Sequence, residues 1–260
     1  MCRLFAVVAS RPSRLDDIVH DDLERFRSLA EAHADGWGIA TRVRSTPPGP
    51  ELTLHRATGG ALGPDFDAHV GAAVAEQAIV HLRRASVGAV EVGNCHPFTW
   101  GEVTFAHNGD ITVTEALDDA PRGFRPGGTT DSELYFSLVV GQYLEAGDWG
   151  VALDRAATFL ATHAEHHAAL NAFLGTPDGL YVYQEADEAE AATRVPGYFD
   201  LFTRTSRDDD LVVVEVASQG VADGTWQRLP RRTVLRLDPT SLDPRRARDL
   251  DEAARWVPAA

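Results

Sequence analysis

The stretch MCRLFAVVAS (residues 1–10) places one of the chain's two cysteines directly after the initiator methionine. Residues 4–9 are all apolar, which predicts a short buried strand that ends at the sequence SRP (10–12). The run is too short, and carries too little positive charge, for a secretory signal. Cys2 is therefore either a small apolar residue at the start of a core strand or, once Met1 is removed, a thiol beside its own free amine.

The composition limits the classes of partner. The chain has 260 residues, enough for one large domain or two small ones. Its formal net charge of −15 argues against nucleic acid and anionic membranes as partners. Cys2 and Cys95 are too few for a disulfide scaffold, and no apolar run reaches membrane-spanning length. We therefore expect a cytoplasmic enzyme or binding protein that acts on a small molecule.

Apolar spacing predicts the secondary structure. Helical periodicity marks residues 13–30, 65–77, 131–146 and 149–164. Ser13 and Asp16 give the first of these helices a capping-box pattern. Short apolar runs predict strands at residues 4–9, 36–43, 51–58, 78–83, 102–106, 170–174, 180–184, 211–217 and 233–237. This order indicates an α+β fold with helices outside stacked sheets.

Two other stretches carry weaker expectations. From Asp238 onwards the chain is charged and contains proline, so we expect it to lie loosely on the surface. His163, His166 and His167 have i, i+3, i+4 spacing, which places them on one helix. We interpret them as part of a solvated helix face and assign them no function.

A strand runs into the sequence AHNGD (106–110). Asn108 offers a side-chain amide N–H, and Gly109 lets the backbone turn and present its own N–H, so the two could form an oxyanion hole. The alternative is an ordinary tight turn, because Asn-Gly is a typical hairpin sequence.

Charged residues follow a second strand and begin a helix. In HLRRASVG (81–88), Arg83 and Arg84 follow a buried strand, and a guanidinium suits a ligand carboxylate. The alternative pairs one arginine with an internal acid and leaves the other in solvent. In TTDSE (129–133), Asp131 either caps a helix or holds a ligand ammonium.

Metal and nucleotide sites have little support. The residues His33, His81, Cys95, His96 and His107 raise the alternative of a metal site, but their spacing matches no tetrahedral zinc pattern. The sequence HADGWG (33–38) does not match the glycine pattern of a dinucleotide-binding loop. We therefore expect neither a metal nor another cofactor.

Taken together, these stretches resemble the class II glutamine amidotransferase domain, an N-terminal-nucleophile hydrolase. The matching pieces are Cys2 after Met1, DGWG (35–38), HLRRAS (81–86), CHPF (95–98), AHNG (106–109) and TDSE (130–133). The resemblance implies a four-layer αββα sandwich over residues 2–238, followed by a charged tail at 239–260. The later pattern, including ASQGVADGTWQRLP (217–230), is similar to small stand-alone γ-glutamyl hydrolases, including the ergothioneine-pathway branch.

The resemblance implies a role for each matched residue. Cys2 falls on the nucleophile, freed by removal of Met1, and Asn108 with Gly109 falls on the oxyanion pair. Arg83 falls on the group that binds the substrate α-carboxylate, and Asp131 on the group that binds the α-ammonium.

Two further positions match, and two depart from the family pattern. His96 and His107 match residues that shape the pocket. His33-Ala34 stands where larger members usually have Arg-Gly, and Arg84 stands where they often have Trp. The second arginine leaves the preferred substrate open.

The implied activity is hydrolysis of a γ-glutamyl amide bond, in glutamine or a γ-glutamyl metabolite, through a γ-glutamyl thioester. An amine with a pKa of about 7.7–8.0 can take the proton of a thiol with a pKa of about 8.5. One alternative is a glutaminase subunit that supplies ammonia to a separate synthetase partner, and another is a catalytically silent binding protein on the same fold. Formation of a homo-oligomer also stays open.

Overall fold

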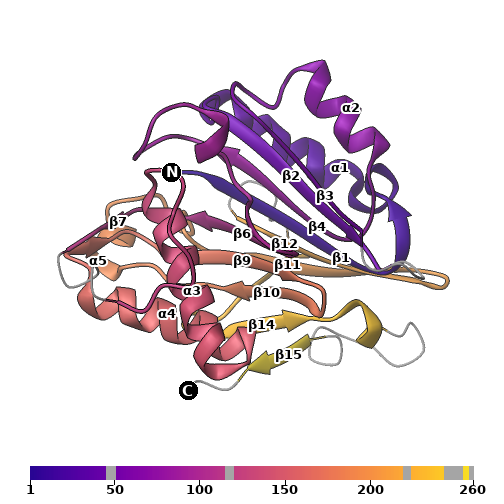
Figure 1. Ribbon diagram of the computed structural model, residues 1–260. Helices are drawn as coiled ribbons and strands as arrows, with labels where there is room; N and C mark the ends of the chain where they lie inside the picture. Colours follow the sequence, from indigo (N-terminus) through magenta and orange to yellow (C-terminus); the bar gives the residue numbers. More distant parts are fainter. Residues whose placement is uncertain (45–50, 115–119, 219–223, 243–253, 258–260) are drawn as a thin grey trace.

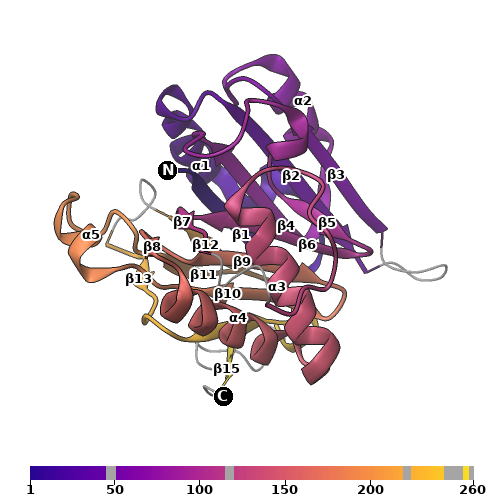
Figure 2. The same ribbon diagram turned by 60° about the vertical axis from the view of Figure 1, so that its left-hand side comes forward.

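The computed structural model describes residues 1–44, 51–114, 120–218, 224–242 and 254–257 (Figure 1). Two β-sheets lie face to face, and helices cover the outer face of each (Figures 1 and 2). Pairing between the described strands is antiparallel. The chain thus has the four-layer αββα architecture that the resemblance implies.

The first sheet has the strand order β13-β11-β12-β1-β4-β2-β3. Its strands are β1 (Arg3–Arg14), β2 (Gly36–Val43), β3 (Glu51–Ala57), β4 (Val74–Arg83), β11 (Phe202–Asp208), β12 (Leu211–Ala217) and β13 (Gln227–Arg228). Helices α1 (Leu15–Ser28) and α2 (Pro64–Ala72) cover its outer face, and the 3-10 turn η1 (Leu29–Ala32) follows α1.

The second sheet has the order β15-β14-β10-β9-β6-β5. Its strands are β5 (Phe98–Trp100), β6 (Val103–Asn108), β9 (Asn171–Thr176), β10 (Gly179–Tyr183), β14 (Val234–Leu237) and β15 (Ala254–Val257). Helices α3 (Asp131–Ala146) and α4 (Trp149–His163) cover its outer face. The smaller elements are η2 (Val92–Asn94), β7 (Ile111–Thr112), β8 (His166–His167), α5 (Glu188–Ala192) and η4 (Pro239–Ser241), of which β7 pairs with β8.

Strand β1 lies inside the first sheet, between β4 and β12, and its first part is buried on both faces. Leu4 and Ala6 join the apolar layer between the two sheets, whereas Phe5 and Val7 pack with the residues of α1. Two-sided burial explains why this stretch is an unbroken apolar run. The same alternation, carried back two residues from Leu4, directs Cys2 towards the space between the sheets.

The first helix begins later than predicted. Strand β1 continues to Arg14, because Ser13 and Arg14 pair with Ala75 and Val74 of β4. Helix α1 begins at Leu15 without a side-chain cap. The capping-box prediction for Ser13 is therefore wrong, since the pairing with β4 makes this residue part of a strand.

Three further predictions differ from the structure. The helix predicted over residues 65–77 ends at Ala72, because β4 extends back to Val74. Helix α4 ends at His163, and residues 166–167 form β8, so the three histidines do not share one helix. Part of the C-terminal stretch expected to lie loosely forms β15, which completes the edge of the second sheet against β14. None of the described helices has the length and apolar character that crossing a bilayer requires.

Gly38 in β2 gives a test of how closely the first sheet approaches the segment that carries His96. A methyl group on Gly38 would lie 2.0 Å from the His96 carbonyl oxygen, so Gly38→Ala should lower the free energy of unfolding by about 1–3 kcal/mol. In the control Gly60→Ala the nearest atom is 3.8 Å away, and stability should stay constant or rise by up to about 1 kcal/mol. Equal urea midpoints for the two variants would contradict this packing.

Candidate active site

A small cavity lies at the end of the molecule where Figure 1 marks the N-terminus. Its lining comes from the residue before β1, the loop after β4, the turn after β6 and the start of α3. The lining residues are Cys2, Arg83, Arg84, Ala85, Ser86, Val87, Asn94, His96, Gly109, Thr130, Asp131 and Ser132. The structure therefore brings six of the eight candidate residues to one cavity, and the other two, His107 and Asn108, lie buried at the adjoining end of β6.

Cys2 is held at the junction of β1 and the loop after β4. Its Sγ lies 3.6 Å from the carbonyl oxygen of Arg84, which can accept the thiol proton in a hydrogen bond. Burial raises the pKa of the Cys2 thiol, although the positive charge of Arg83 opposes this in part. The thiol is therefore protonated at neutral pH and needs a base before it can attack as a thiolate.

Arg83 is the last residue of β4, and its side chain is 3 % exposed. Its two terminal nitrogens donate to the carbonyl oxygens of Ala89 (3.0 Å) and Val87 (3.2 Å). Across the described part of the chain, no carboxylate lies within ion-pair distance of this guanidinium. A buried cation without a counter-charge is costly, so Arg83 is suited to bind a ligand carboxylate in the cavity.

Asp131 is the first residue of α3 and is 8 % exposed. One carboxylate oxygen accepts from the backbone N–H of Ile111 (2.7 Å), and the other accepts from that of Ser132 (2.9 Å). The cap of α3 is Thr130, whose hydroxyl accepts from the N–H of Glu133. Asp131 is therefore not the capping residue, and its carboxylate faces the cavity at a helix N-terminus, where negative charge is favoured.

Asn108 ends β6 and is fully buried. Neither its amide nitrogen nor its amide oxygen has a hydrogen-bond partner among the described residues. Leaving such a group unsatisfied costs about 1–3 kcal/mol, which makes Asn108 a ready donor to a bound ligand. Gly109 must lack a side chain, because a Cβ would lie 1.8 Å from the Ala169 carbonyl oxygen.

The hairpin alternative for the Asn-Gly pair is wrong. Strand β6 pairs with β5 and β9, whereas β7, which follows the turn, pairs with β8. The chain therefore leaves the second sheet at Asn108 instead of folding back along β6. This exit leaves the backbone of Gly109 at the cavity.

The two candidate histidines differ in position. His107 has both ring nitrogens in use, with Ser132 Oγ at 2.9 Å and the Ala169 carbonyl oxygen at 3.1 Å, so it ties β6 to the start of α3. His96 lines the cavity, and its Nδ1 lies 2.7 Å from Nε2 of His81 in β4. Burial lowers the pKa of both His81 and His96 well below the ordinary value, so neither ring is a good proton acceptor for the thiol.

One group in the described part of the chain has the donor types of a zinc site. Ligand atoms of Cys2, His81 and His96 lie within 4.8 Å of one another. However, the two rings share a hydrogen bond, so a nitrogen of each faces the other ring instead of a common centre. This arrangement does not fit a tetrahedral ion, and we derive no step through a metal.

Asp35 is a positioning residue that the sequence analysis did not single out. Its carboxylate accepts from the backbone N–H of Ala85 (2.8 Å), and its own N–H donates to the Arg83 carbonyl oxygen (3.2 Å). These bonds attach the loop after β4 to the start of β2. The sequence signal was present, since Asp35 begins the DGWG stretch.

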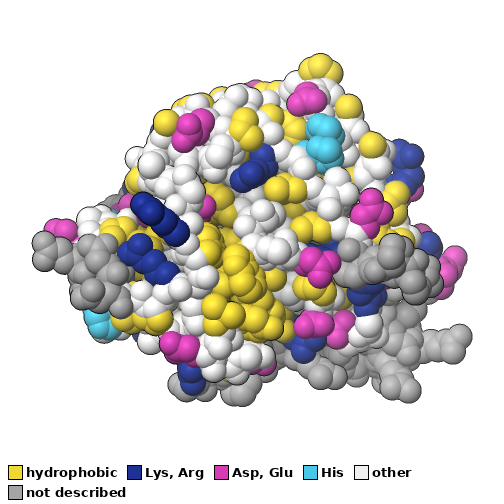
Figure 3. Space-filling model, in the orientation of Figure 1, with side chains coloured by type: hydrophobic (Ala, Val, Ile, Leu, Met, Phe, Trp, Pro, Cys, Tyr) yellow, Lys and Arg dark blue, Asp and Glu magenta, His cyan; other side chains and the backbone are white. Residues whose placement is uncertain are grey.

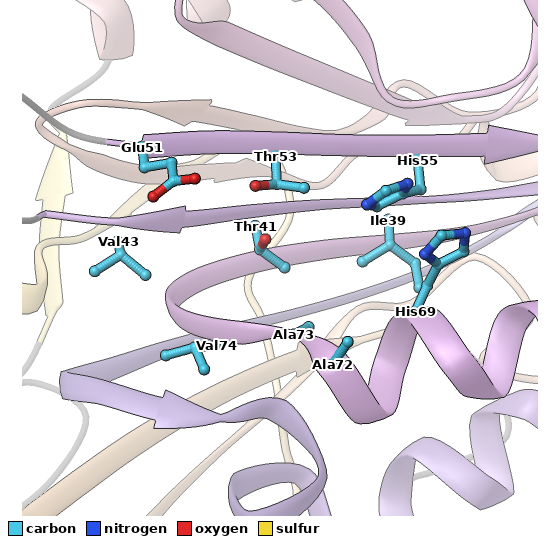
Figure 4. Close-up of a pocket in the computed structure, with 10 residues that line it drawn as sticks. All are labelled: Ile39, Thr41, Val43, Glu51, Thr53, His55, His69, Ala72, Ala73 and Val74. Carbon is cyan, nitrogen blue, oxygen red and sulfur yellow. The ribbon is translucent and has the colours of Figure 1, made fainter.

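A wider hollow of about 320 Å³ lies between β2, β3 and the end of α2 (Figure 4). The rings of His55 and His69 stack there with centroids 3.8 Å apart. None of the candidate site residues lines this hollow, so the smaller cavity is the candidate active site.

Comparison with known proteins identifies the family. The sequence model of the family described as class-II glutamine amidotransferases matches residues 1–235. The chain belongs to this enzyme family.

Two curated relatives align with most of the chain. YafJ of Escherichia coli (strain K12) is 27% identical over 259 residues, covering 88% of this chain and 94% of its own. A Saccharomyces cerevisiae protein, "Probable glutamine amidotransferase DUG3", is 24% identical and covers 90% of this chain and 81% of its own.

Two solved structures share the fold. The "glutamine aminotransferase class-II domain protein" from Silicibacter pomeroyi has a TM-score of 0.62 at 21% identity, and the match covers 98% of this chain and 97% of that chain. The glutamine phosphoribosylpyrophosphate amidotransferase from B. subtilis has a TM-score of 0.64 at 15% identity. That match covers all of this chain and 49% of the B. subtilis chain, so the present chain corresponds to about half of that enzyme.

Arg83→Lys should lower kcat/KM for amide hydrolysis of glutamine, because a single ammonium cannot replace the bidentate guanidinium. The expected loss is on the order of 2–5 kcal/mol of binding, measured by steady-state kinetics. Arg56→Lys is the matched control, since Arg56 also donates to a backbone carbonyl, that of Cys95 (3.2 Å), but does not line the cavity. A similar kcat/KM for both variants would show that Arg83 only supports the loop.

Proposed function

We propose that this protein hydrolyses the side-chain amide of γ-glutamyl compounds, with Cys2 as the nucleophile after removal of Met1. The observation that carries this proposal is the meeting of a thiol, an unpaired buried guanidinium and a carboxylate in one small cavity. A γ-glutamyl group carries the complementary charges, an α-carboxylate for Arg83 and an α-ammonium for Asp131. Its γ-carbonyl, three carbon atoms from the charged end, is then available to Cys2.

The free amine of Cys2 is the base in this mechanism. It takes the thiol proton, the thiolate attacks the γ-carbonyl carbon, and the N–H groups of Asn108 and Gly109 stabilise the oxyanion. The protonated amine then gives its proton to the leaving nitrogen as the C–N bond breaks, which leaves a γ-glutamyl thioester. Water attacks the thioester, and glutamate leaves as the thiol is restored.

The surroundings of Met1 support its removal. While Met1 is present, the nitrogen of Cys2 is a peptide amide and cannot act as a base. Met1 packs against the buried cluster formed by Ala168, Ala169, Ala186 and Phe199, so its side chain occupies space beside the site. Burial also lowers the pKa of the Met1 amine, which means that an amine in this region is readily obtained in its neutral form.

Removal of Met1 gives the first test of this proposal. Intact mass of the purified protein should lack one methionine. A variant with an uncleaved extension before Cys2 should fold, as judged by its melting temperature, but should have no measurable hydrolase activity. The matched control carries the same extension with a protease site that is cut directly before Cys2, and cutting should restore activity. Full activity of the uncut protein would overturn the assignment of Cys2.

The preferred substrate is proposed to be a γ-glutamyl amide of a small metabolite, with glutamine a weaker substrate. Arg84 supports this preference because it is exposed and lines the cavity, where it can meet an anionic leaving group. The chain contains no lysine, so the dark blue side chains in Figure 3 are all arginine. Some of these arginines lie at the left of the face shown, on the same side as the N-terminus in Figure 1.

The test of substrate class compares kcat/KM for glutamine with values for γ-glutamyl amides whose leaving groups are neutral or carry a carboxylate. We expect the anionic leaving groups to be preferred, and Arg84→Ala to reduce that preference by about 3- to 10-fold, the size of a partly screened charge interaction. Glutamine as the best substrate, with ammonia released, would instead favour a glutaminase subunit. Absence of hydrolysis with every compound would favour a silent binding protein.

A further inference from the structure

His33 is a buried residue of the DGWG-containing segment that has no place in the mechanism above. It follows η1, and its side chain is 4 % exposed. Its Nδ1 lies 2.6 Å from the carbonyl oxygen of Leu29, one turn earlier. Its Nε2 is buried and has no hydrogen-bond partner among the described residues.

The bond to Leu29 fixes the tautomer of the ring. A carbonyl oxygen only accepts, so Nδ1 must carry a proton. Burial lowers the pKa of His33, as do the charges of Arg3 and the N-terminal ammonium. These causes outweigh the backbone contacts with Leu29 and Met1, which favour the charged ring, so the ring is neutral near pH 7. Nε2 of a neutral ring with its proton on Nδ1 is a hydrogen-bond acceptor without a donor.

The group that faces this acceptor changes when Met1 is removed. In the unprocessed chain the His33 ring lies beside the backbone carbonyl of Met1, which is bonded directly to the nitrogen of Cys2. The carbonyl is also an acceptor, which explains why Nε2 is left without a partner. Removal of Met1 takes this carbonyl away and turns the Cys2 nitrogen into an amine with N–H donors.

We propose that His33 is the positioning residue for the catalytic amine: Nε2 accepts an N–H from the α-amine of mature Cys2 and orients its lone pair towards the thiol. This inference rests on the proposed function, because it requires Cys2 to be the free N-terminus. This role requires a hydrogen-bond acceptor at position 33, which histidine provides and arginine does not.

The bond also sets the basicity of the amine. Burial lowers the pKa of the Met1 amine, and the positive charges of Arg84 and Arg3 act in the same direction, so we expect them to lower the pKa of the neighbouring Cys2 amine too. An acceptor such as Nε2 favours the charged form of the amine and raises its pKa. His33 therefore keeps the amine basic enough to take the thiol proton. His81 of β4 also senses the charge of the His33 ring, and burial keeps His81 neutral.

Two substitutions separate the two ring nitrogens. His33→Asn places an amide N–H where Nδ1 donates to Leu29 but removes the acceptor at Nε2. His33→Gln is longer and places an amide oxygen near the position of Nε2, at the expense of the bond to Leu29. A purely structural role predicts that Asn is the better replacement, whereas the positioning role predicts that Gln is.

The chain has only two cysteines, so labelling with ¹³C-cysteine gives signals from Cys2 and Cys95 alone. The Cα shift of Cys2, followed against pH by NMR, reports the amine pKa without any substrate. We expect His33→Asn to lower this pKa by about one pH unit and His33→Gln to leave it within about 0.3 unit of the wild type. In the same samples, His33→Asn should lower kcat by about 10- to 100-fold with KM nearly constant.

Intact mass and melting temperature are measured for each variant, and any variant that retains Met1 is prepared from a fusion cut directly before Cys2. Equal amine pKa values in all three proteins, equal shifts in both variants, or a wild-type kcat for His33→Asn would overturn the role of His33. A wild-type protein that hydrolyses no γ-glutamyl amide would instead overturn the proposed function. The NMR titration would still judge whether His33 bonds the amine.

Discussion

The position of β1 inside the first sheet constrains everything at the active site. Antiparallel neighbours on both edges, β4 and β12, and apolar layers on both faces fix the strand from its first residue. In addition, the backbone N–H of Leu4 donates a hydrogen bond to Ser218 Oγ (2.9 Å). A chain terminus is normally among the least ordered parts of a protein. Here the chain terminus leads directly into a strand that is paired on both edges and buried on both faces, which gives the thiol of Cys2 a defined place.

The spacing of apolar residues predicted the elements that are buried on both faces or that have a clear helical start and end. The bounds predicted for β2, α3 and β12 (36–43, 131–146 and 211–217) are those in the structure. Strand β11 was missed, because its sequence FTRTSRD is largely polar and its conformation is set by pairing with β12, with which it forms a hairpin across Asp209 and Asp210. The early end of α2 was missed for the same reason, since pairing with β1 overrides the helical spacing of the residues that begin β4.

The candidate site could be drawn from the sequence only as a set of strand ends and a helix start. The resemblance supplied which residues belong together, and the fold supplies the reason: β1, β4, β6 and α3 all begin or end at one cavity. The spacing of residues in the sequence does not show which hydrogen bonds the buried polar side chains form. The bond between His81 and His96, the bond from the Ile111 N–H to the Asp131 carboxylate, and the absence of a partner for Asn108 among the described residues are all long-range outcomes of packing.

Several of the buried polar atoms that lack a hydrogen-bond partner among the described residues belong to side chains at or near the candidate site. They include both amide atoms of Asn108 and one ring nitrogen each of His33, His81 and His96. Each costs free energy in the unliganded protein, because a buried polar group without a partner has lost its bonds to water. A ligand that supplies the missing partners recovers this free energy on binding and stabilises the folded chain in proportion to its occupancy. The cost of folding this region is thus linked to recognition, because the atoms of His81 in β4 and Asn108 in β6 that lack partners are satisfied only when a ligand supplies them.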